Sequence, residues 1–275
     1  MHVSIFNQYG ASNSVPVFAA VKEGLTRLGI QTSYHNMDAD VAVIWSFLWA
    51  GRMLPNKQVY EHYRSTGRDV LIVEVGMLKR GITWKLCLNS TLSGGTYGKG
   101  SDPDRATKQG LKLKPWTNSG TNILIALQRS DSGQWGHGPK MQVWLQETVD
   151  HLRKFTERPI VVRPHPRQSV VMPSGVIVQR PQKLATDRFD FDSALTNTWA
   201  VINHNSGPGS QAVIAGVPAF VGLSSLASSV GNLTMGNIEN PNRPDREEWL
   251  SQIAHTEWTV KEIATGLPLA RLLQT

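Results

Sequence analysis

Residues 200–221 read AVINHNSGPGSQAVIAGVPAFV and predict the architecture of the second half of this chain. The run opens with a short apolar strand, AVIN, and continues through a polar turn rich in glycine. A helix of small residues follows and ends at Gly216, and the apolar run AFV then predicts a second strand. Strand, helix and strand in this order indicate two parallel strands joined by a crossover helix.

The same alternation extends to both sides of this stretch. Apolar runs of strand length recur along the chain, and segments with helical spacing lie between many of them. Alternation of this kind predicts an α/β fold with parallel sheets covered by helices on both faces. Strands are expected at His2–Asn7, Val41–Trp45, Val70–Val75, Trp84–Leu88, Asn122–Leu127, Pro159–Val162 and Val176–Val178, and helices at Val15–Leu28, Asn56–Ser65, Lys140–Phe155, Asp192–Thr196, Arg243–His255 and Val260–Ala264.

Residues 93–121 interrupt the alternation. They contain six glycines and two prolines, and they carry a basic stretch at 108–114. A connection of this length and composition indicates a linker or a functional loop. We therefore expect an N-terminal Rossmann-like domain at 1–115, a C-terminal Rossmann-like domain at 116–245, and helices at 246–275 that pack back towards the first domain.

Composition and charge narrow the class of protein. The chain has 275 residues, is 40% hydrophobic, and contains one cysteine, which excludes an internal disulfide framework. No apolar run reaches the roughly 18 residues needed to span a bilayer, and the start lacks the pattern of a secretory signal, so we expect a cytoplasmic protein. A net charge of +7 and a pI near 9.6 favour a polyanionic partner or an anionic small substrate.

Polar residues follow three of the expected strands in the second half, at 128–131, 163–167 and 204–209. Ligands of open α/β sheets bind at the carboxyl ends of the strands, so these three sets are expected to form one pocket. Cationic side chains and a glycine-containing turn before a helix suit a phosphate or diphosphate. The alternative is that the arginines pair with surface acids. The residues expected to bind this donor group are Arg129, Arg163, His165, Arg167, Asn205, Ser206, Gly207, Gly209, Ser210 and Gln211.

The sequence Arg163-Pro164-His165-Pro166-Arg167, the serine turn at Ser206 and the later Gly216-Val217-Pro218 together resemble GT-B glycosyltransferases. The likeness is to capsular-polysaccharide-type and sialyltransferase-like enzymes and to short phage-encoded glycosyltransferases, and it covers roughly residues 122–266. It implies two Rossmann-like domains with parallel sheets facing a cleft. It also implies a nucleotide-sugar co-substrate, UDP- or CMP-linked, with no metal and no other cofactor.

Two positions depart from that pattern. Many capsule-type enzymes carry a glutamate in the helix after the serine turn, where it holds the ribose hydroxyls, and this chain has Gln211. The sialyltransferase-like enzymes carry an acidic pair before a glycine in the first domain. Here Glu74-Val75-Gly76 supplies one acid instead of two.

Glycosyl transfer needs a base for the acceptor hydroxyl and positive charge at the departing phosphate. The proposed catalytic residues are Glu74, at the end of the apolar strand VLIVEV, and His165 in the donor pocket. Burial at a strand end favours a carboxyl poised to accept a proton. The alternative for Glu74 is that it orders a loop by accepting hydrogen bonds from backbone N–H groups.

The acceptor is the least determined part. The basic charge and the likeness to phage enzymes favour a hydroxymethylated pyrimidine in double-stranded phage DNA, modified in the host cytoplasm. The alternatives are a surface polysaccharide or lipid-linked glycan acceptor, and a nucleotide- or nucleic-acid-binding protein without catalysis. Basic residues of the expected loops would contact the DNA: Lys79, Arg80, Lys108, Lys112 and Lys114.

Overall fold

The computed structural model describes residues 1–100, 102–136, 138–185 and 188–273. The chain divides into two compact units, which we call unit 1 and unit 2. Unit 1 comprises Met1–Arg105, Asp131–Gln134 and Gln252–Thr275, and unit 2 comprises Ala106–Ser130 and Trp135–Ser251. The chain thus enters unit 2 earlier than the boundary expected at 115, and its C-terminal segment belongs to unit 1.

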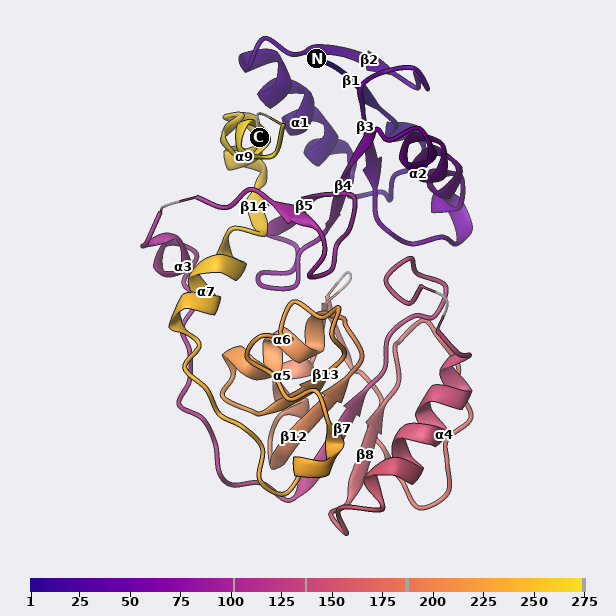
Figure 1. Ribbon diagram of the computed structural model, residues 1–275, viewed down its shortest axis with the longest axis vertical. Coiled ribbons are helices and arrows are strands. Elements are labelled where there is room, and N and C mark those ends of the chain that lie inside the picture. The colour runs from indigo at the N-terminus through magenta and orange to yellow at the C-terminus, as the bar shows by residue number, and fades with distance from the viewer. Residues whose placement is uncertain (101, 137, 186–187, 274–275) are drawn as a thin grey trace. The chain divides into compact units, whose positions relative to one another are not determined.

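Unit 1 is built on a mixed sheet with the strand order β14-β5-β4-β3-β1-β2, and β6 pairs with β5 (Figure 1). Strands β1 to β4 are parallel to one another, whereas β5, β6 and β14 run antiparallel to their neighbours. The expected sheet was wholly parallel. The difference arises because only residues 76–82 join β4 to β5, which is too short for a crossover helix. The strands are β1 His2–Ile5, β2 Gln31–Tyr34, β3 Val41–Trp45, β4 Asp69–Val75, β5 Thr83–Leu88, β6 Thr96–Tyr97 and β14 Glu257–Thr259.

Helices cover both faces of this sheet. Helix α1, Val15–Arg27, packs its apolar stripe on one face, together with α8, Val260–Ala264, and α9, Leu267–Leu273. Helix α2, Pro55–Ser65, covers the opposite face (Figure 1). The core on the α1 side contains Trp45, Trp84 and Trp258, which are almost fully buried, so tryptophan fills this core. Short 3-10 turns lie at Asn7–Tyr9 and Gly51–Met53.

Unit 2 carries a wholly parallel sheet with the strand order β13-β12-β7-β8-β9. Helix α4, Met141–Leu152, packs on one face, and α6, Gly207–Ile214, lies on the other (Figure 1). Helix α7, Glu247–Ala254, begins in unit 2 and ends in unit 1. Unit 2 also contains the short helix α5, Phe191–Ala194, and a 3-10 turn at Met235–Asn237. Its strands are β7 Asn122–Ala126, β8 Ile160–Arg163, β9 Ile177–Val178, β10 Lys183–Ala185, β11 Arg188–Phe189, β12 Thr198–Asn203 and β13 Ala219–Val221.

The long connection at 93–121 is not one loop. It contains β6 and the short helix α3, Arg105–Lys108. Beyond α3 the chain runs along the end of α6, where the amide of Lys114 donates to the carbonyl of Ile214 at 3.0 Å and that of Thr117 to the carbonyl of Gly216 at 2.7 Å. These hydrogen bonds fix the second half of the connection to unit 2. None of the helices in the described ranges is long and apolar enough to cross a membrane.

Candidate functional site

The three polar sets of the second half meet at the carboxyl edge of the unit 2 sheet. Strand β7 lies between β12 and β8, and all three run parallel. In register, Ala126 at the end of β7 lies beside Arg163 at the end of β8. Neighbouring parallel strands end on the same side of a sheet, so the loops after β7, β8 and β12 begin at one edge, and a single pocket formed by the three sets stays a prediction.

Two amide side chains join the loop after β7 to the loop after β12. The side chain of Gln128 donates to Oδ1 of Asn205 at 2.7 Å and accepts from the backbone amide of Asn205 at 3.1 Å. The Nδ2 group of Asn205 donates to the hydroxyl of Ser224, after β13, at 3.0 Å. Both amide residues are buried, so these hydrogen bonds hold three loops of the edge in one arrangement.

The serine turn is held by the last residue of β12. The side chain of Asn203 accepts from the backbone amide of Ser206 at 2.9 Å, and its Nδ2 group donates to the carbonyl of Ala126 and the hydroxyl of Ser206, each at 2.9 Å. Ser206 occupies the position before α6, but its side chain accepts no amide of that helix. The turn therefore presents a helix N-terminus at the edge, where backbone amides and the helix dipole favour an anion.

The other residues expected in this turn lie in the first two turns of α6. Gly207 begins the helix, Gly209 and Ser210 are buried, and Gln211 is partly exposed. An added Cβ at Gly209 would lie 2.8 Å from Cγ1 of Val221 on β13, so this glycine permits the close approach of helix to sheet.

Arg163 ends β8 in a buried ion pair. Its Nη2 atom lies 2.6 Å from Oδ1 of Asp190, and the two side chains are 5% and 17% exposed. Asp190 also accepts from the amide of Gln182 at 2.7 Å and from the hydroxyl of Ser193 at 3.1 Å. Burial raises the pKa of Asp190, the hydrogen bond from Arg163 lowers it, and the net direction is down. Arg163 thus pairs with an acid, as the alternative to phosphate binding predicted, but the pair is buried and not on the surface.

One part of Arg163 is not used by that pair. Its Nη1 atom is buried and has no hydrogen-bond partner among the described residues. A buried guanidinium N–H without an acceptor costs free energy, about 1–3 kcal/mol, unless a ligand satisfies it. Arg163 therefore has one nitrogen, Nη2, bound to Asp190, and its role in binding a phosphate stays a prediction that rests on Nη1.

His165 lies in the turn after β8. Its Nδ1 atom accepts the backbone amide of Arg167 at 3.1 Å, so in the neutral ring the hydrogen is carried by Nε2. Gln168 ties this turn to the loop after β7 by accepting from the amide of Ser130 at 2.9 Å and donating to its hydroxyl at 2.8 Å. The structure thus places the loop that contains Arg129 next to the turn of His165.

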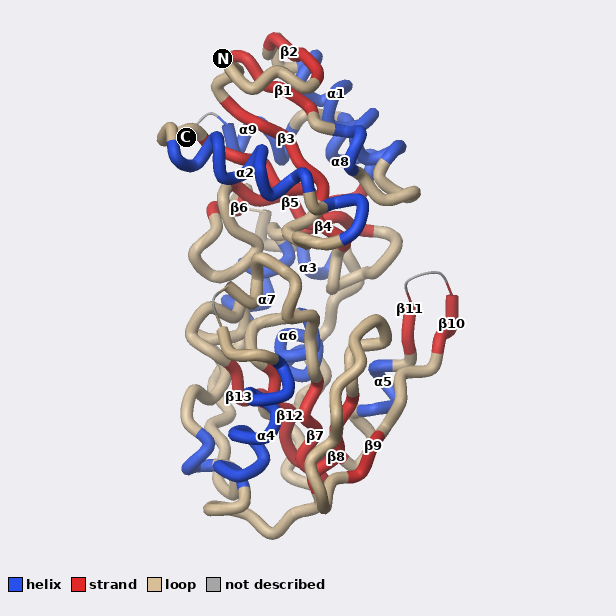
Figure 2. The backbone as a smooth tube through the Cα atoms, turned by 90° about the vertical axis from the view of Figure 1, so that its right-hand side faces the viewer, coloured by secondary structure: helices blue, strands red, loops and turns tan. Residues whose placement is uncertain are grey.

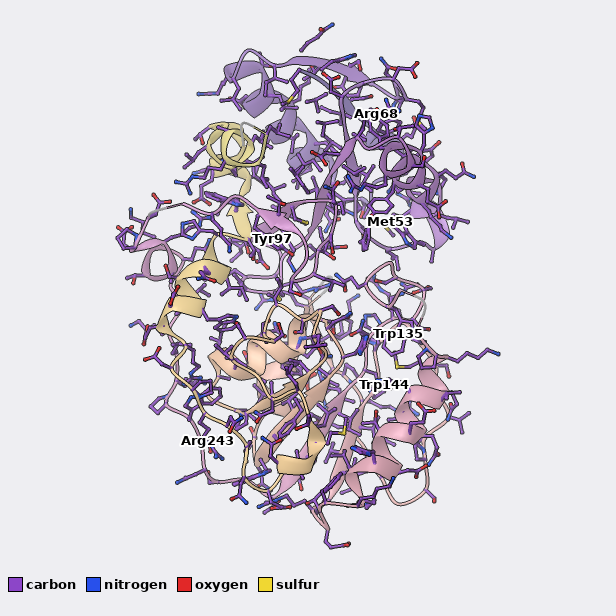
Figure 3. All side chains as sticks on the ribbon, in the orientation of Figure 1. Met53, Arg68, Tyr97, Trp135, Trp144 and Arg243 are labelled. Carbon is purple, nitrogen blue, oxygen red and sulfur yellow. The ribbon has the colours of Figure 1, made fainter. Side chains whose placement is uncertain are left out.

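His204, the first residue after β12, lies in an aromatic cluster on the α4 side. Its ring centroid is 4.8 Å from that of Trp135 and 6.1 Å from that of Trp144, and these two tryptophans lie near the start of α4 (Figure 3). Burial lowers the pKa of His204. A neutral imidazole between indole rings indicates a packing role for this histidine.

Glu74 on β4 accepts three hydrogen bonds in unit 1. Its Oε2 atom accepts from the hydroxyl of Ser46 at 2.7 Å and from the amide of Phe47 at 3.1 Å, and Oε1 accepts from the amide of Val75 at 2.8 Å. Glu74 therefore orders the start of the loop after β3, which is the structural role that we weighed against a catalytic one. A carboxylate offers about four lone-pair sites, so one site on Oε1 remains for a proton.

The basic residues expected to contact an acceptor belong to both units. Lys79 and Arg80 lie in the turn between β4 and β5 of unit 1, whereas Lys108, Lys112 and Lys114 lie in unit 2. The buried carboxylate of Glu257 fixes the turn between β4 and β5. It accepts hydrogen bonds from the amides of Met77 at 2.6 Å and Leu78 at 3.1 Å and from the hydroxyl of Thr83 at 2.7 Å.

Sequence reasoning missed several residues that hold the loops at the carboxyl edge of the unit 2 sheet. Asn203, Asp190, Gln168 and Ser224 hold the loops together, yet none was expected to act there. Asn203 was the detectable one, because a polar side chain that ends an otherwise apolar strand points to a specific hydrogen-bond role. The others pair across 19 to 38 residues of sequence, and no local pattern indicates such pairs.

No model of a protein family matches this chain, and no curated protein matches it in sequence. Solved structures do match. The beta Kdo 2,7 transferase of Thermosulfurimonas dismutans KpsC aligns with a TM-score of 0.55 at 13% identity, over 97% of this chain and 98% of that one. The beta Kdo 2,4 transferase of the same KpsC aligns with a TM-score of 0.52 at 12% identity, over 97% and 98%.

At these identities the likeness concerns the fold. The chain is an α/β protein with two sheets rich in parallel pairs, and its fold is GT-B-like, as in the KpsC structures. The GT-B fold expected from residues 122–266 is therefore confirmed, and the match extends over nearly the whole chain.

Proposed function

We propose that this chain is a glycosyltransferase that binds a nucleotide-linked sugar at the carboxyl edge of the unit 2 sheet and transfers the sugar to a glycan hydroxyl. The observation that carries the proposal is the meeting of Arg163, His165 and the Ser206 turn at that edge, in a chain with the fold of two Kdo transferases. Guanidinium, imidazole N–H and helix amides are the groups that proteins use for phosphates.

The donor phosphate would accept the hydrogen bond that Nη1 of Arg163 lacks. The Nε2–H of His165 and the amides at the start of α6 would supply further donors. As the bond between sugar and phosphate breaks, negative charge grows on the phosphate oxygens, and fixed donors stabilise that charge without reorganisation. His165 is the group proposed to contact the leaving phosphate.

Kdo, the sugar in the names of the two similar structures, is an acid, and we propose an acidic sugar of this kind as the donor sugar. Arg129 and Arg167 lie in the loops after β7 and β8 and would pair with its carboxylate. A CMP-linked donor is the form to test first, with UDP-sugars as the comparison. Gln211 on α6 would contact the nucleotide.

Glu74 is the proposed base for the acceptor hydroxyl. Its carboxylate is fixed by three hydrogen bonds, and it retains a lone pair on Oε1 to receive the proton. Fixed orientation matters because a catalytic base must meet the acceptor oxygen at hydrogen-bond distance.

The test is binding and turnover with pure donors. Calorimetry should show CMP-Kdo binding that falls by about tenfold or more in His165→Ala, which removes one charge-assisted or polar phosphate contact. Lys154→Ala, an exposed residue of unit 2 that precedes the amino end of β8 and so lies away from the carboxyl edge, is the matched control. If the wild type binds no CMP- or UDP-sugar, the proposed function is wrong.

The similar structures favour a glycan acceptor over the DNA acceptor expected from charge and phage likeness. The DNA acceptor was inferred from the net charge of +7, the basic stretch at 108–114 and the likeness to short phage enzymes. The two acceptors separate in one measurement, since DNA binding weakens with salt by a log–log slope of about −0.9 for each phosphate neutralised. Transfer from CMP-Kdo to a Kdo-ended oligosaccharide, without a salt-dependent duplex complex, is the result that we expect.

A further inference from the structure

A ridge of exposed side chains borders unit 2. Strand β9 is the last strand of its sheet, because it pairs with β8 on one side and with no strand of the described ranges on the other. β10 and β11 follow as an antiparallel hairpin that projects from the sheet (Figure 2). We call residues 177–185 and 188 the edge ridge.

The edge ridge exposes large aliphatic side chains. Ile177, Val178 and Leu184 are 56%, 40% and 63% exposed. They are three of the fourteen large apolar side chains that lie exposed in the described residues, within a ridge of ten residues. Successive side chains of a strand point to opposite faces, so Ile177 and Val178 show that neither face of the edge strand is covered. A concentration of this kind marks an interaction site.

Basic residues alternate with these aliphatic ones. Arg180, Lys183 and Arg188 are exposed, and none of the three forms an ion pair with a residue that the structure describes. The sequence contains no aspartate or glutamate from residue 158 to residue 186. Asp187 directly precedes Arg188 in the sequence, and Asp190 is paired with Arg163. The ridge therefore combines exposed aliphatic surface with three cations and a net positive charge.

The combination distinguishes between possible partners. A nucleic acid or an acidic polysaccharide would pair with the three cations, but it would leave the aliphatic side chains in water, since its phosphates and hydroxyls gain nothing from them. The interface of an anionic bilayer accepts both kinds of side chain, because aliphatic groups enter the acyl boundary and cations remain at the phosphates.

We propose that the edge ridge docks unit 2 on the surface of an anionic lipid bilayer. Ile177, Val178 and Leu184 enter the headgroup region, and the three cations contact lipid phosphates. The inference rests on the exposed residues of the ridge and is independent of the proposed transferase activity.

The experiment measures partitioning of the full chain onto vesicles. Phosphatidylcholine vesicles with about one-third phosphatidylglycerol are compared with pure phosphatidylcholine, by sedimentation. The variant Arg180→Gln, Lys183→Gln, Arg188→Gln should bind the anionic vesicles about a hundredfold more weakly, since each cation near such a surface contributes a factor of roughly five. The variant Ile177→Ser, Leu184→Ser should bind about tenfold more weakly.

Matched controls remove the same charge and apolar area elsewhere. Lys57→Gln, Lys140→Gln, Lys154→Gln removes three exposed cations, and Val15→Ser, Leu267→Ser removes two exposed aliphatic side chains. Both controls should bind within about twofold of the wild type. Circular dichroism and the melting temperature verify that every variant is folded, and no step of the assay needs sugar transfer.

Three results would each overturn the proposal. The first is an equal loss in the control triple variant, which would mean that bulk charge draws the chain to the vesicles. The second is full displacement by a DNA duplex together with no effect of the aliphatic variant, which would indicate a polyanion surface. The third is a dimer in light scattering that the aliphatic variant dissociates, without vesicle binding, which would indicate an interface between copies.

Discussion

The hydroxyl of Ser46 donates a hydrogen bond of 2.7 Å to Oε2 of Glu74, across the carboxyl ends of the neighbouring parallel strands β3 and β4. Ser46 adopts a φ of 65°, a left-handed conformation that residues other than glycine seldom take. This conformation and the hydrogen bond occur at the residue that directly follows β3. Strain of this kind is often retained where a side chain must be held for function.

Replacing Ser46 should separate the two contributions. Ser46→Ala loses the hydrogen bond and keeps the strain, so the free energy of unfolding should fall by about 1–2 kcal/mol. Ser46→Gly also loses the hydrogen bond but adopts a positive φ readily, so it should lose less. Both should lower kcat by about tenfold or more because Glu74 loses one of the three hydrogen bonds that orient it, while the donor Kd stays unchanged. If the wild type and both variants have equal kcat values, Glu74 is not the catalytic base.

Arg163 and Asp190 should respond differently to substitution. Arg163→Ala leaves a carboxylate without its cation and removes the unpartnered Nη1, so we expect a loss of about 3 kcal/mol in unfolding free energy and a donor Kd raised by about tenfold or more. Asp190→Asn keeps the arginine and its Nη1, so it should destabilise the fold but raise the donor Kd by less than about threefold.

Urea unfolding and calorimetry on the same samples would separate the two effects. The donor Kd of Arg163→Ala is measured well below the melting temperature of that variant. If this Kd is unchanged, Arg163 does not bind the donor and only pairs with Asp190.

Much of the fold could be predicted from the sequence because its main helices and strands have long, regular apolar patterns. The helix expected at Val15–Leu28 is α1, Val15–Arg27, and the apolar strands Val41–Trp45 and Asn122–Leu127 are β3 and β7. Each has an apolar pattern that one secondary structure alone can bury.

The missed elements are short, and their partners are distant in sequence. Strand β14, Glu257–Thr259, pairs with β5 more than 160 residues earlier, and only that pairing makes it a strand. Strand β2, Gln31–Tyr34, is polar and lies at the sheet edge, so it carries no apolar signal.

The site shows the same division. Local motifs identified the edge residues His165 and Ser206, since a proline-flanked turn and a glycine-containing turn are visible in sequence. The pairing of Arg163 with Asp190 spans 27 residues and follows from tertiary structure alone. Sequence therefore located the edge, but it did not show which of its donors are already engaged.

Gln128 and Asn205 should behave as one unit. Gln128→Ala removes the acceptor of the buried Asn205 amide and the donor to its Oδ1, and Asn205→Ala removes the Oδ1 that accepts from Gln128, so each should cost about 1–3 kcal/mol. The double variant should cost less than the sum, with a coupling energy of about 1 kcal/mol or more. Denaturant titrations of the four proteins measure that coupling. Strict additivity would mean that the two loops are held by other contacts.

His204 should make the fold sensitive to acid. Burial between Trp135 and Trp144 lowers the pKa of His204, so the unfolded chain binds a proton at this residue at a higher pH than the folded chain does. The neutral ring contributes fully to stability above its ordinary pKa of about 6.5, and that contribution declines as the pH falls below this value.

His204→Phe keeps an aromatic ring against both tryptophans and removes the titration. Between about pH 7.5 and about pH 5.5 the melting temperature of the wild type should therefore fall further than that of the variant. All other residues are common to the two proteins, so the difference between the two falls reports the substitution at His204. His151→Phe, which replaces an exposed histidine on α4, should follow the wild type. If His204→Phe loses as much stability in acid as the wild type, the imidazole is not buried as a neutral ring and is available to a ligand at the donor edge.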